Sequence, residues 1–303
     1  RENKVFNQQM NLLTRLMQGV PFNPEYYYNT QIRRQEGRLQ FEDEWSSYLE
    51  TKTYLKIGEN GYGEPSRNYY AQPSFLYATL GTFARINFGD RKVDSYFQRR
   101  YIYGHKPVLY VGAEVGSYYF SQIPSYRMYG KLQLMLRQNV DLGIAGELNY
   151  LFQAGMVLGK VPYTLLHHFA GNQTHTFDMY RFSLMNNYQY AADQYIALHA
   201  HWNGKGVLLN LIPGLRYLRL RELLEVKVAY GGLRQDHESI LPFPTTQVGY
   251  TTLEAPNVPY VEMGVGIGNI LRIGEVYGVF RLTKIHDPQV PWWAVRFRLH
   301  LGM

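Results

Sequence analysis

The stretch that decides the fold lies close to the end of the chain and reads Trp293-Ala294-Val295-Arg296-Phe297-Arg298-Leu299-His300-Leu301. Apolar side chains fill the odd-numbered positions, while Arg296, Arg298 and His300 fill three of the even-numbered ones. Successive side chains of a β-strand point to opposite faces of its sheet. A period of two therefore predicts a strand that is apolar on one face and cationic on the other.

The same alternation recurs along most of the chain. Residues 220–230 place Leu224, Val226 and Val228 opposite Glu225 and Lys227. Two more segments repeat it: Leu132, Leu134 and Leu136 oppose Lys131, Gln133 and Arg137, and Val261, Met263, Val265 and Ile267 oppose Glu262, Gly264, Gly266 and Gly268. Further strands are predicted within 75–89, 108–120, 144–158, 188–202 and 276–282. These patterns predict an all-β protein.

The length of the alternating runs favours a membrane setting. Several persist for about ten residues or more, which a tilted strand needs to cross a bilayer, whereas strands in soluble proteins average about 5 to 6 residues. A charge facing lipid at mid-depth costs about 2 to 4 kcal/mol, so the restriction of charges to one parity is informative. We predict a closed antiparallel transmembrane β-barrel of about 12–16 strands, built from residues 1–303, with an even strand number favoured.

Composition excludes several other classes. The 303 residues include 31 Lys and Arg, 24 Asp and Glu, and no Cys, so a disulfide framework and a thiolate metal site are ruled out. Basic residues are scattered along the chain, which argues against nucleic-acid binding. No apolar run is long enough for a transmembrane helix. The chain begins at Arg1 without a signal peptide, and we expect it to be the C-terminal part of a longer precursor.

Aromatic residues mark the ends of the predicted strands. Tyr and Trp prefer the headgroup level of a membrane, where a ring is apolar at one end and wet at the other. Trp292, Trp293, Tyr118 and Tyr119 are the predicted interface residues. Long connections are expected within 1–73, 168–177 and 234–249, with a tight turn at 271–274, and such asymmetry is typical of outer-membrane barrels.

By parity, the polar residues predicted to face the lumen are Glu225, Lys227, Arg296, Arg298, His199 and His201. Two histidines at i and i+2 bind a divalent ion only if further ligands join them, and none is identifiable; the other interpretation is a pair of hydrated or hydrogen-bonded lumenal histidines. The glycines of 264–268 share one face and no helix follows, unlike a dinucleotide-binding loop. We expect no cofactor, no metal and no catalytic residue.

Two further expectations concern the predicted faces. Arg at Val265 or Val228 should impair membrane insertion, whereas Ala at Arg298 or Lys227 should be tolerated. The run Val207-Leu208-Leu209, continued by Leu211-Ile212-Pro213, lies at a strand end. It either dips into the membrane interface or packs as an ordinary turn.

Several stretches resemble a known family. They are residues 159–166, which begin Gly159-Lys160-Val161-Pro162-Tyr163, then Gly171-Asn172-Gln173-Thr174, Phe182-Ser183-Leu184-Met185-Asn186, Asn203-Gly204, and the segments 210–213, 218–222, 259–267 and 280–283. Together they resemble the C-terminal barrel of a bacterial outer-membrane family of unknown function, whose members often carry a carboxypeptidase-like regulatory domain. More distantly, the order of parts is similar to the BamA-like outer-membrane assembly superfamily. That superfamily has an Arg-Gly pair in its lumenal loop, where this chain has Gly171-Asn172.

The patterns and the resemblance together predict an integral outer-membrane β-barrel of a Gram-negative bacterium, acting in transport, assembly or anchoring and not as an enzyme. Its expected partners are outer-membrane lipid and other outer-membrane or periplasmic proteins, without nucleic acid. Two alternatives stay open. One is a barrel-embedded hydrolase, which needs Ser, His and a carboxylate converging at one rim. The other is a soluble secreted β-sheet binding protein.

Overall fold

The computed structural model describes residues 32–46, 48–62, 74–89, 91–94, 99–102, 105–120, 125–172, 174–186, 189–237, 239–240, 257–285 and 291–299. Its main sheet has 11 antiparallel strands. In spatial order they are β1 (Ile32–Glu44), β2 (Leu49–Tyr62), β3 (Phe75–Asn87), β6 (Val108–Phe120), β7 (Ser125–Asp141), β8 (Glu147–Leu158), β11 (Gln194–Asn203), β12 (Arg221–Gly232), β13 (Tyr260–Ile270), β14 (Gly274–Arg281) and β15 (Trp293–Leu299).

The remaining elements are short. Strands β4 (Arg91–Asp94) and β5 (Arg99–Ile102) form one small sheet, and β9 (His167–His168) and β10 (Ala191–Ala192) form another. Helical turns occur at Gly143–Ala145, Tyr163–Leu165, Leu209–Leu211 and Gln235–His237, and in the helix α2 (Leu215–Leu218). None of the helices in the described ranges is long and apolar enough to cross a bilayer.

The predicted strands agree with the observed ones best where alternation is strict. The prediction for 108–120 coincides with β6, and that for 75–89 covers β3. The strand predicted at 144–158 begins later, because Gly143 and Gly146 adopt positive φ around a 3-10 turn. The strand predicted at 188–202 begins only at Gln194, because the described residues before it belong to a folded connection. The tight turn predicted at 271–274 is confirmed, with Leu271 and Arg272 at positive φ.

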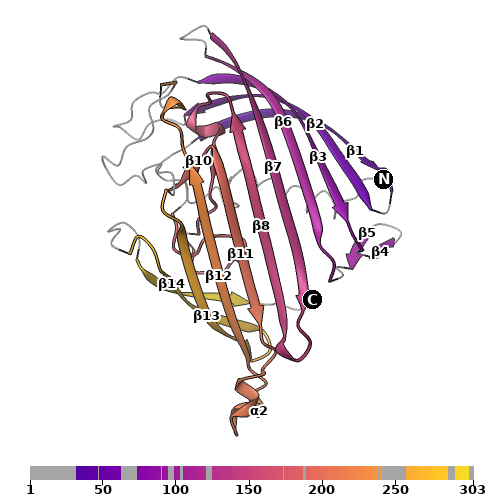
Figure 1. The fold of residues 1–303 in the computed structure, drawn as a ribbon, viewed down its shortest axis with the longest axis vertical. Helices are drawn as coiled ribbons and strands as arrows, with labels where there is room; N and C mark the ends of the chain where they lie inside the picture. Colours follow the sequence, from indigo (N-terminus) through magenta and orange to yellow (C-terminus); the bar gives the residue numbers. More distant parts are fainter. Residues whose placement is uncertain are drawn as a thin grey trace.

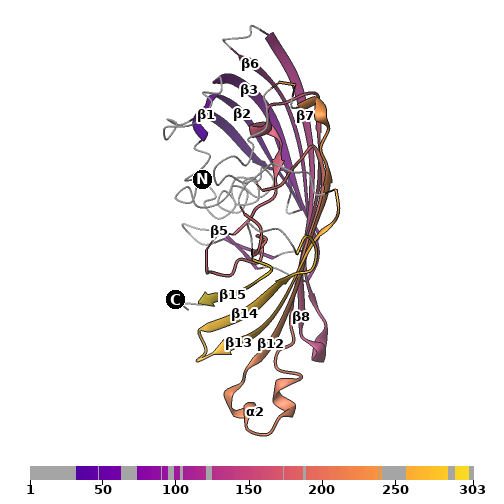
Figure 2. The ribbon, with the colours of Figure 1, turned by 90° about the vertical axis from the view of Figure 1, so that its left-hand side faces the viewer.

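The sheet is strongly curved, with one convex and one concave face (Figures 1 and 2). Strands β1 and β15 form its two edges and do not pair with each other. The described strands therefore make an open sheet of 11, and not the closed sheet of about 12–16 strands expected from the sequence. The strands of the main sheet follow one another in space in the same order as in the sequence, so the sheet contains no crossover connection.

The convex face carries the apolar rows. In β13, burial alternates residue by residue, with Met263, Val265 and Ile267 exposed. Leu134 and Phe297, from distant strands, have 37% and 49% of their surface exposed. In a two-sheet sandwich these rows would meet in a shared core, but the described strands place no second sheet over them. Soluble monomers rarely expose a continuous apolar surface of this kind.

The two rims of the sheet differ, and we name them as they lie in Figure 1. The lower rim holds the short connections 45–48, 142–146 and 271–273, and also two longer ones: the connection from β3 to β6, which contains β4 and β5, and residues 204–220 with α2. The upper rim holds the long connection 159–193, which leaves β8 and returns to β11. This connection folds back onto the concave face (Figure 2), and we call it the inner segment.

Candidate functional site

The inner segment fills the concave side of the sheet opposite β8 and β11–β15. Its residues 161–172 and 181–185 are all buried, although many are polar. Asn172 organises the middle of the segment, because its Oδ1 accepts hydrogen bonds from the N–H and the hydroxyl of Thr174, and its Nδ2 donates to the carbonyl of Thr176 at 2.7 Å. Side chains of this type stabilise turns by bonding to nearby main chain. The segment is thus folded in its own right as well as docked.

Glu262 of β13 holds the main chain of the inner segment. Its carboxylate accepts hydrogen bonds from the backbone N–H groups of Ser183 and Leu184, at 2.7 and 2.6 Å. The hydroxyl of Tyr260 donates a third bond at 2.6 Å. Glu262 is fully buried, and a buried carboxylate is stable only when its oxygens are bonded in this way.

Lys227 of β12 complements Glu262 with the opposite charge. Its ammonium donates to the carbonyl oxygens of Asp178 at 3.0 Å and Arg181 at 2.7 Å, and lies 3.3 Å from the hydroxyl of Ser183. It also pairs with Glu225 of the same strand at 3.1 Å. Because Lys227 and Glu262 are register partners on adjacent strands, a cation and an anion lie side by side beneath the segment. Lys227 binds carbonyl groups of the inner segment, and Glu262 binds its N–H groups.

The last strand is bound by both side chain and main chain. Arg296 donates to the carbonyl oxygen of Ser183. The backbone N–H of Phe297 donates to the carbonyl of His175 at 2.9 Å, and its carbonyl accepts from the N–H of Phe177 at 2.6 Å. This parallel bridge between Thr176 and Phe297 lies on the edge of β15 that β14 does not occupy. The inner segment therefore covers part of an edge strand, which would otherwise present unpaired backbone groups.

An aromatic stack fixes the part of the segment that reaches β14. The ring of Phe177 lies parallel to that of Tyr277, with centroids 3.8 Å apart. The Tyr277 hydroxyl donates to Glu275 at 2.8 Å and so must accept from Nε2 of His201, which lies 3.0 Å away. Gly266 faces this ring: a Cβ built there would lie 2.7 Å from Cδ1 of Tyr277. The alternating glycines of β13 thus make room for inward side chains of the adjacent strands, Glu225 at Gly264, Tyr277 at Gly266 and Leu223 at Gly268, and they lie within a strand and not in a nucleotide-binding loop.

At the upper rim, Asp193 ties the end of the segment to the connection after β12. It pairs with Arg234 and accepts from Nε2 of His237 at 3.2 Å. The other ring nitrogen of His237 accepts a hydrogen bond from the N–H of Val161 at 3.1 Å. Both nitrogens are therefore occupied, so this His–Asp pair offers no base to a serine, and its arrangement is structural.

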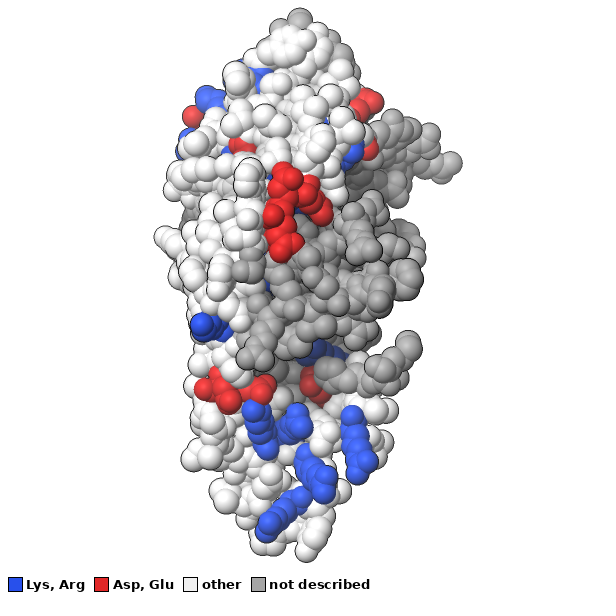
Figure 3. Space-filling model, turned by 90° about the vertical axis from the view of Figure 1, so that its right-hand side faces the viewer, with Lys and Arg blue, Asp and Glu red and all other residues white. Residues whose placement is uncertain are grey.

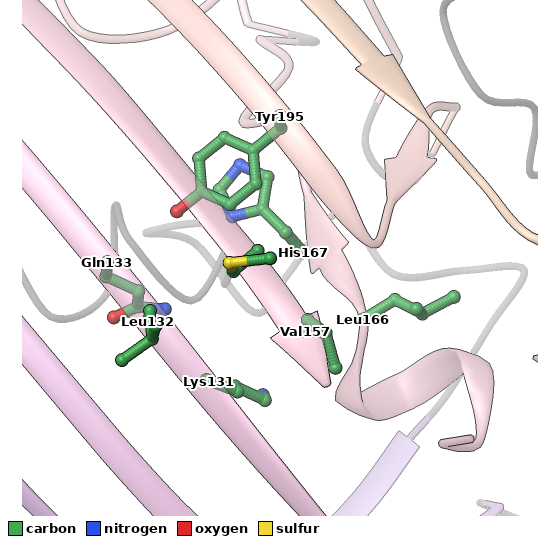
Figure 4. A pocket seen from close by; sticks show the side chains of 8 residues that line it. Lys131, Leu132, Gln133, Val157, Leu166, His167 and Tyr195 are labelled. Atoms are coloured by element: carbon green, nitrogen blue, oxygen red, sulfur yellow. The ribbon is translucent and has the colours of Figure 1, made fainter. Parts of the chain in front are cut away.

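A small pocket marks the seam between the segment and the wall. Figure 4 shows the ring of His167 lying against that of Tyr195, with centroids 3.5 Å apart, beside Gln133 and Val157. The pocket has room for about one water molecule, which is too small for an organic ligand.

The polar residues predicted to face the lumen differ in how deeply they are buried on the concave side. Glu225, Lys227, His199, His201 and Arg296 are buried on the concave side. His199 packs against Phe182, and His201 bonds to Tyr277, so the two imidazoles have separate partners. No group of three or more metal-ligating side chains occurs among the described residues. Arg298 differs from the others: it is part-exposed and lies 3.7 Å from Glu275.

The predicted interface aromatics need one correction. Trp292 and Trp293 are half-exposed at the upper end of β15, and Tyr119 stacks on Tyr126 at the upper end of β6 and β7. Their role at a membrane surface stays a prediction. Tyr118, however, is only 1% exposed and lies on the inner face, where its hydroxyl donates to the carbonyl of Lys160 at 2.7 Å. Adjacent residues of a strand face opposite ways, so Tyr118 and Tyr119 cannot both be outward.

Sequence reasoning did not identify the docking partners. The sequence places Glu262 only in an alternating row and Ser183 only in a stretch that resembles the family, and it gives no signal for a role of Phe177 or Tyr277. Glycine in a strand marks a close approach of other groups, but at the inward glycines of β13 those groups are side chains of adjacent strands, so the glycines do not point to the docked segment. The segment itself gives no periodic signal.

Comparisons with known proteins give the following. A family model described as "Family of unknown function (DUF5686) C-terminal domain" matches residues 64–237. A comparison with curated proteins finds none that matches. Among solved structures, the crystal structure of BamA from Haemophilus ducreyi lacking POTRA domains 1-3 is similar with a TM-score of 0.34 and 9% identity, over 87% of this chain and 59% of that one. The chain thus spans less than two thirds of that structure's length.

Proposed function

The chain belongs to the family of unknown function (DUF5686), by the match of its C-terminal domain model to residues 64–237, and from this premise we propose that it is an integral β-barrel protein of the Gram-negative outer membrane. In this proposal it acts as a transport, assembly or anchoring component and not as an enzyme. Its partners are outer-membrane lipid and other outer-membrane or periplasmic proteins, and nucleic acid is not among them.

One observation carries the proposal, which is the contrast between the two faces of a single sheet. The convex face exposes apolar rows such as Met263, Val265 and Ile267, while the concave face buries charged residues and a folded segment. Hydrocarbon outside and a filled polar interior inside would satisfy both faces at once. Water on the convex side would leave the apolar rows without a partner.

Closure of the barrel is part of the proposal. A sheet edge has unpaired N–H and C=O groups, each of which costs several kcal/mol in hydrocarbon. Strand β1 begins at the upper rim and β15 ends at the lower rim, as follows from 11 alternating strands. A closed barrel with an even number of strands, about 12–16, needs at least one more strand between these edges.

Because the interior is filled, the proposal favours a plugged barrel and not an open diffusion pore. The inner segment bonds to β12, β13 and β15 and is buried along most of its described length. Passage of a solute on that side would require the segment to move.

The test is to purify the chain in detergent and to reconstitute it in planar bilayers. We expect a band that shifts on heating in SDS gels, loss of solubility when the detergent is removed, and conductance that is low until the segment is released. A chain that stays monomeric and folded in water without detergent would overturn the proposal.

A further inference from the structure

The lower rim carries a lobe, residues 204–220 between β11 and β12, that extends beyond the ends of the strands (Figure 1). It contains the helical turn Leu209–Leu211 and the helix α2. The N–H of Leu208 donates to the carboxylate of Glu222 at 3.1 Å, and the side-chain amide of Asn269 donates to the carbonyl of Arg219 at 2.7 Å. The lobe is therefore held in a defined position against β12 and the turn after β13.

This lobe exposes large apolar side chains where a turn in water would have polar ones. Tyr217 is 88% exposed and Leu211 is 77% exposed, and Leu208, Ile212 and Leu218 are also exposed. The neighbouring turn adds Leu271. Single exposed apolar residues are ordinary, but a contiguous group at one end of a molecule marks a surface that contacts an apolar phase or a partner.

Arginines surround this apolar group. Arg216, Arg219 and Arg272 are exposed, and within the part of the chain that the structure describes no carboxylate lies within ion-pair distance of them. The nearby Lys205 is instead paired with Glu147 at 2.6 Å. Figure 3 shows basic side chains gathered at this end of the molecule. The free charge of the lobe is thus positive and available to an anion.

The lobe also continues the convex apolar surface. The outward row of β13 runs through Val265 and Ile267 and is followed within a few residues by Leu271 and Arg272. If hydrocarbon covers the row, the arginines come at the depth where the headgroups begin. Arg side chains at such a boundary keep the stem in the apolar layer and extend the guanidinium to phosphate oxygens.

We propose that this lobe, with the turn 271–273, is a site for anionic phospholipid, in which Leu211, Tyr217 and Leu271 enter the interface and Arg216, Arg219 and Arg272 bind headgroup phosphates. The inference rests on the proposed function, because it requires a bilayer around the sheet. It goes beyond that function by assigning the lower rim a preference among lipids. A protein partner is the other possible occupant of the lobe. It would not explain why the apolar surface of the lobe continues the lipid-facing row of β13.

The absence of cysteine from the chain makes a direct test simple. Tyr217→Cys and Val265→Cys variants are labelled with a bimane fluorophore and reconstituted into vesicles of phosphatidylcholine, with or without phosphatidylglycerol. Asp236→Cys, at an exposed position near the upper rim, is the aqueous control. Quenching is then measured with brominated phosphatidylglycerol and with brominated phosphatidylcholine.

The expected result is quenching at 265 by both lipids, stronger quenching at 217 by phosphatidylglycerol than by phosphatidylcholine, and none at 236. Replacing one of the three arginines by Gln should lower the preference at 217 by about fivefold, as expected for one basic residue at an anionic surface. Equal quenching at 217 by the two lipids, or no quenching at 217 while 265 is quenched, would overturn the lipid site and leave the proposed function standing. No quenching at 265 would overturn both.

Discussion

The two halves of the sheet use inward charges in different ways. In the half formed by β1, β2, β3 and β6, charged residues pair with each other across strands: Lys52 with Glu42 at 2.9 Å, Arg85 with Glu50 at 3.5 Å, and Lys56 with Glu114 at 3.8 Å. In the half formed by β11–β15, Lys227, Glu262 and Arg296 bind the main chain of the inner segment. Charges of the same type and parity thus form ion pairs between strands of the sheet in one half and bind the main chain of the inner segment in the other.

The connections contribute to this difference. A short turn such as 45–48 returns the chain directly to the next strand, and inward charges can pair across the two strands it joins, as Lys52 of β2 pairs with Glu42 of β1. The connection after β8 is long enough to fold back, and its backbone groups must be satisfied once they are buried. Fixed charges on the wall supply those bonds. The comparison therefore predicts that removal of a charge has different consequences in the two halves.

The largest effect is expected from Glu262→Ala. This change leaves the N–H groups of Ser183 and Leu184 without these acceptors and removes the anion opposite Lys227 on the adjacent strand, so that Lys227 keeps Glu225 as its paired carboxylate. Breaking a buried charged network by removing one partner costs about 3–5 kcal/mol. We expect the inner segment to detach while the wall stays folded, and hydrogen exchange at residues 181–185 measures this.

Glu114→Ala is the matched control, because Glu114 is also buried and contacts Lys56 and the hydroxyl of Tyr54 in the other half. It should destabilise the wall, seen as a lower temperature for the gel shift on heating, without faster exchange at 181–185. If both variants expose the segment equally, the distinction between the two halves is wrong.

Much of this architecture was predictable from sequence, and the inner layer was not. Alternation predicted which residues of β12, β13 and β15 face outward, because strand geometry converts parity directly into a face. The contact between Ser183 and Glu262 joins residues 79 positions apart, and nothing local in 168–177 shows that this connection is buried rather than exposed. Tyr118 shows the same limit, since an aromatic pair at a strand end has one member on each face.

The second prediction concerns a substitution in the outward apolar row of β13 and not in the inner segment. Val265→Arg places a charge on the convex face near the middle of β13, which costs about 2–4 kcal/mol at the centre of a bilayer. We expect a smaller fraction of chains to insert into vesicles, while the solubility of the unfolded chain in urea changes little. Normal insertion of this variant, measured by protease protection, would mean that the convex face does not contact lipid.

A smaller effect is expected within the inner layer from Tyr277→Phe. The ring still stacks on Phe177, but His201 and Glu275 lose the hydroxyl that joins them. Two hydrogen bonds are lost, and each is worth about 0.5–1.5 kcal/mol. Exchange at 176–178 should therefore rise modestly. Gly266→Val, which displaces the ring itself, should release the same residues fully. Identical behaviour of the two variants would show that the stack contributes nothing.

The smallest effect is expected from Arg298→Ala, and it sharpens the comparison within one half of the sheet. Arg298 shares parity with Arg296, and the sequence alone gave Arg298 and Lys227 the same expectation of tolerance. The structure separates them, because Arg298 is part-exposed with one partner at 3.7 Å, whereas Lys227 is buried with four. An exposed ion pair contributes about 0–1 kcal/mol, so Arg298→Ala should leave segment exchange and thermal stability unchanged within error. Lys227→Ala should release residues 178–183, and equal tolerance of both would mean that the segment does not depend on the charges beneath it.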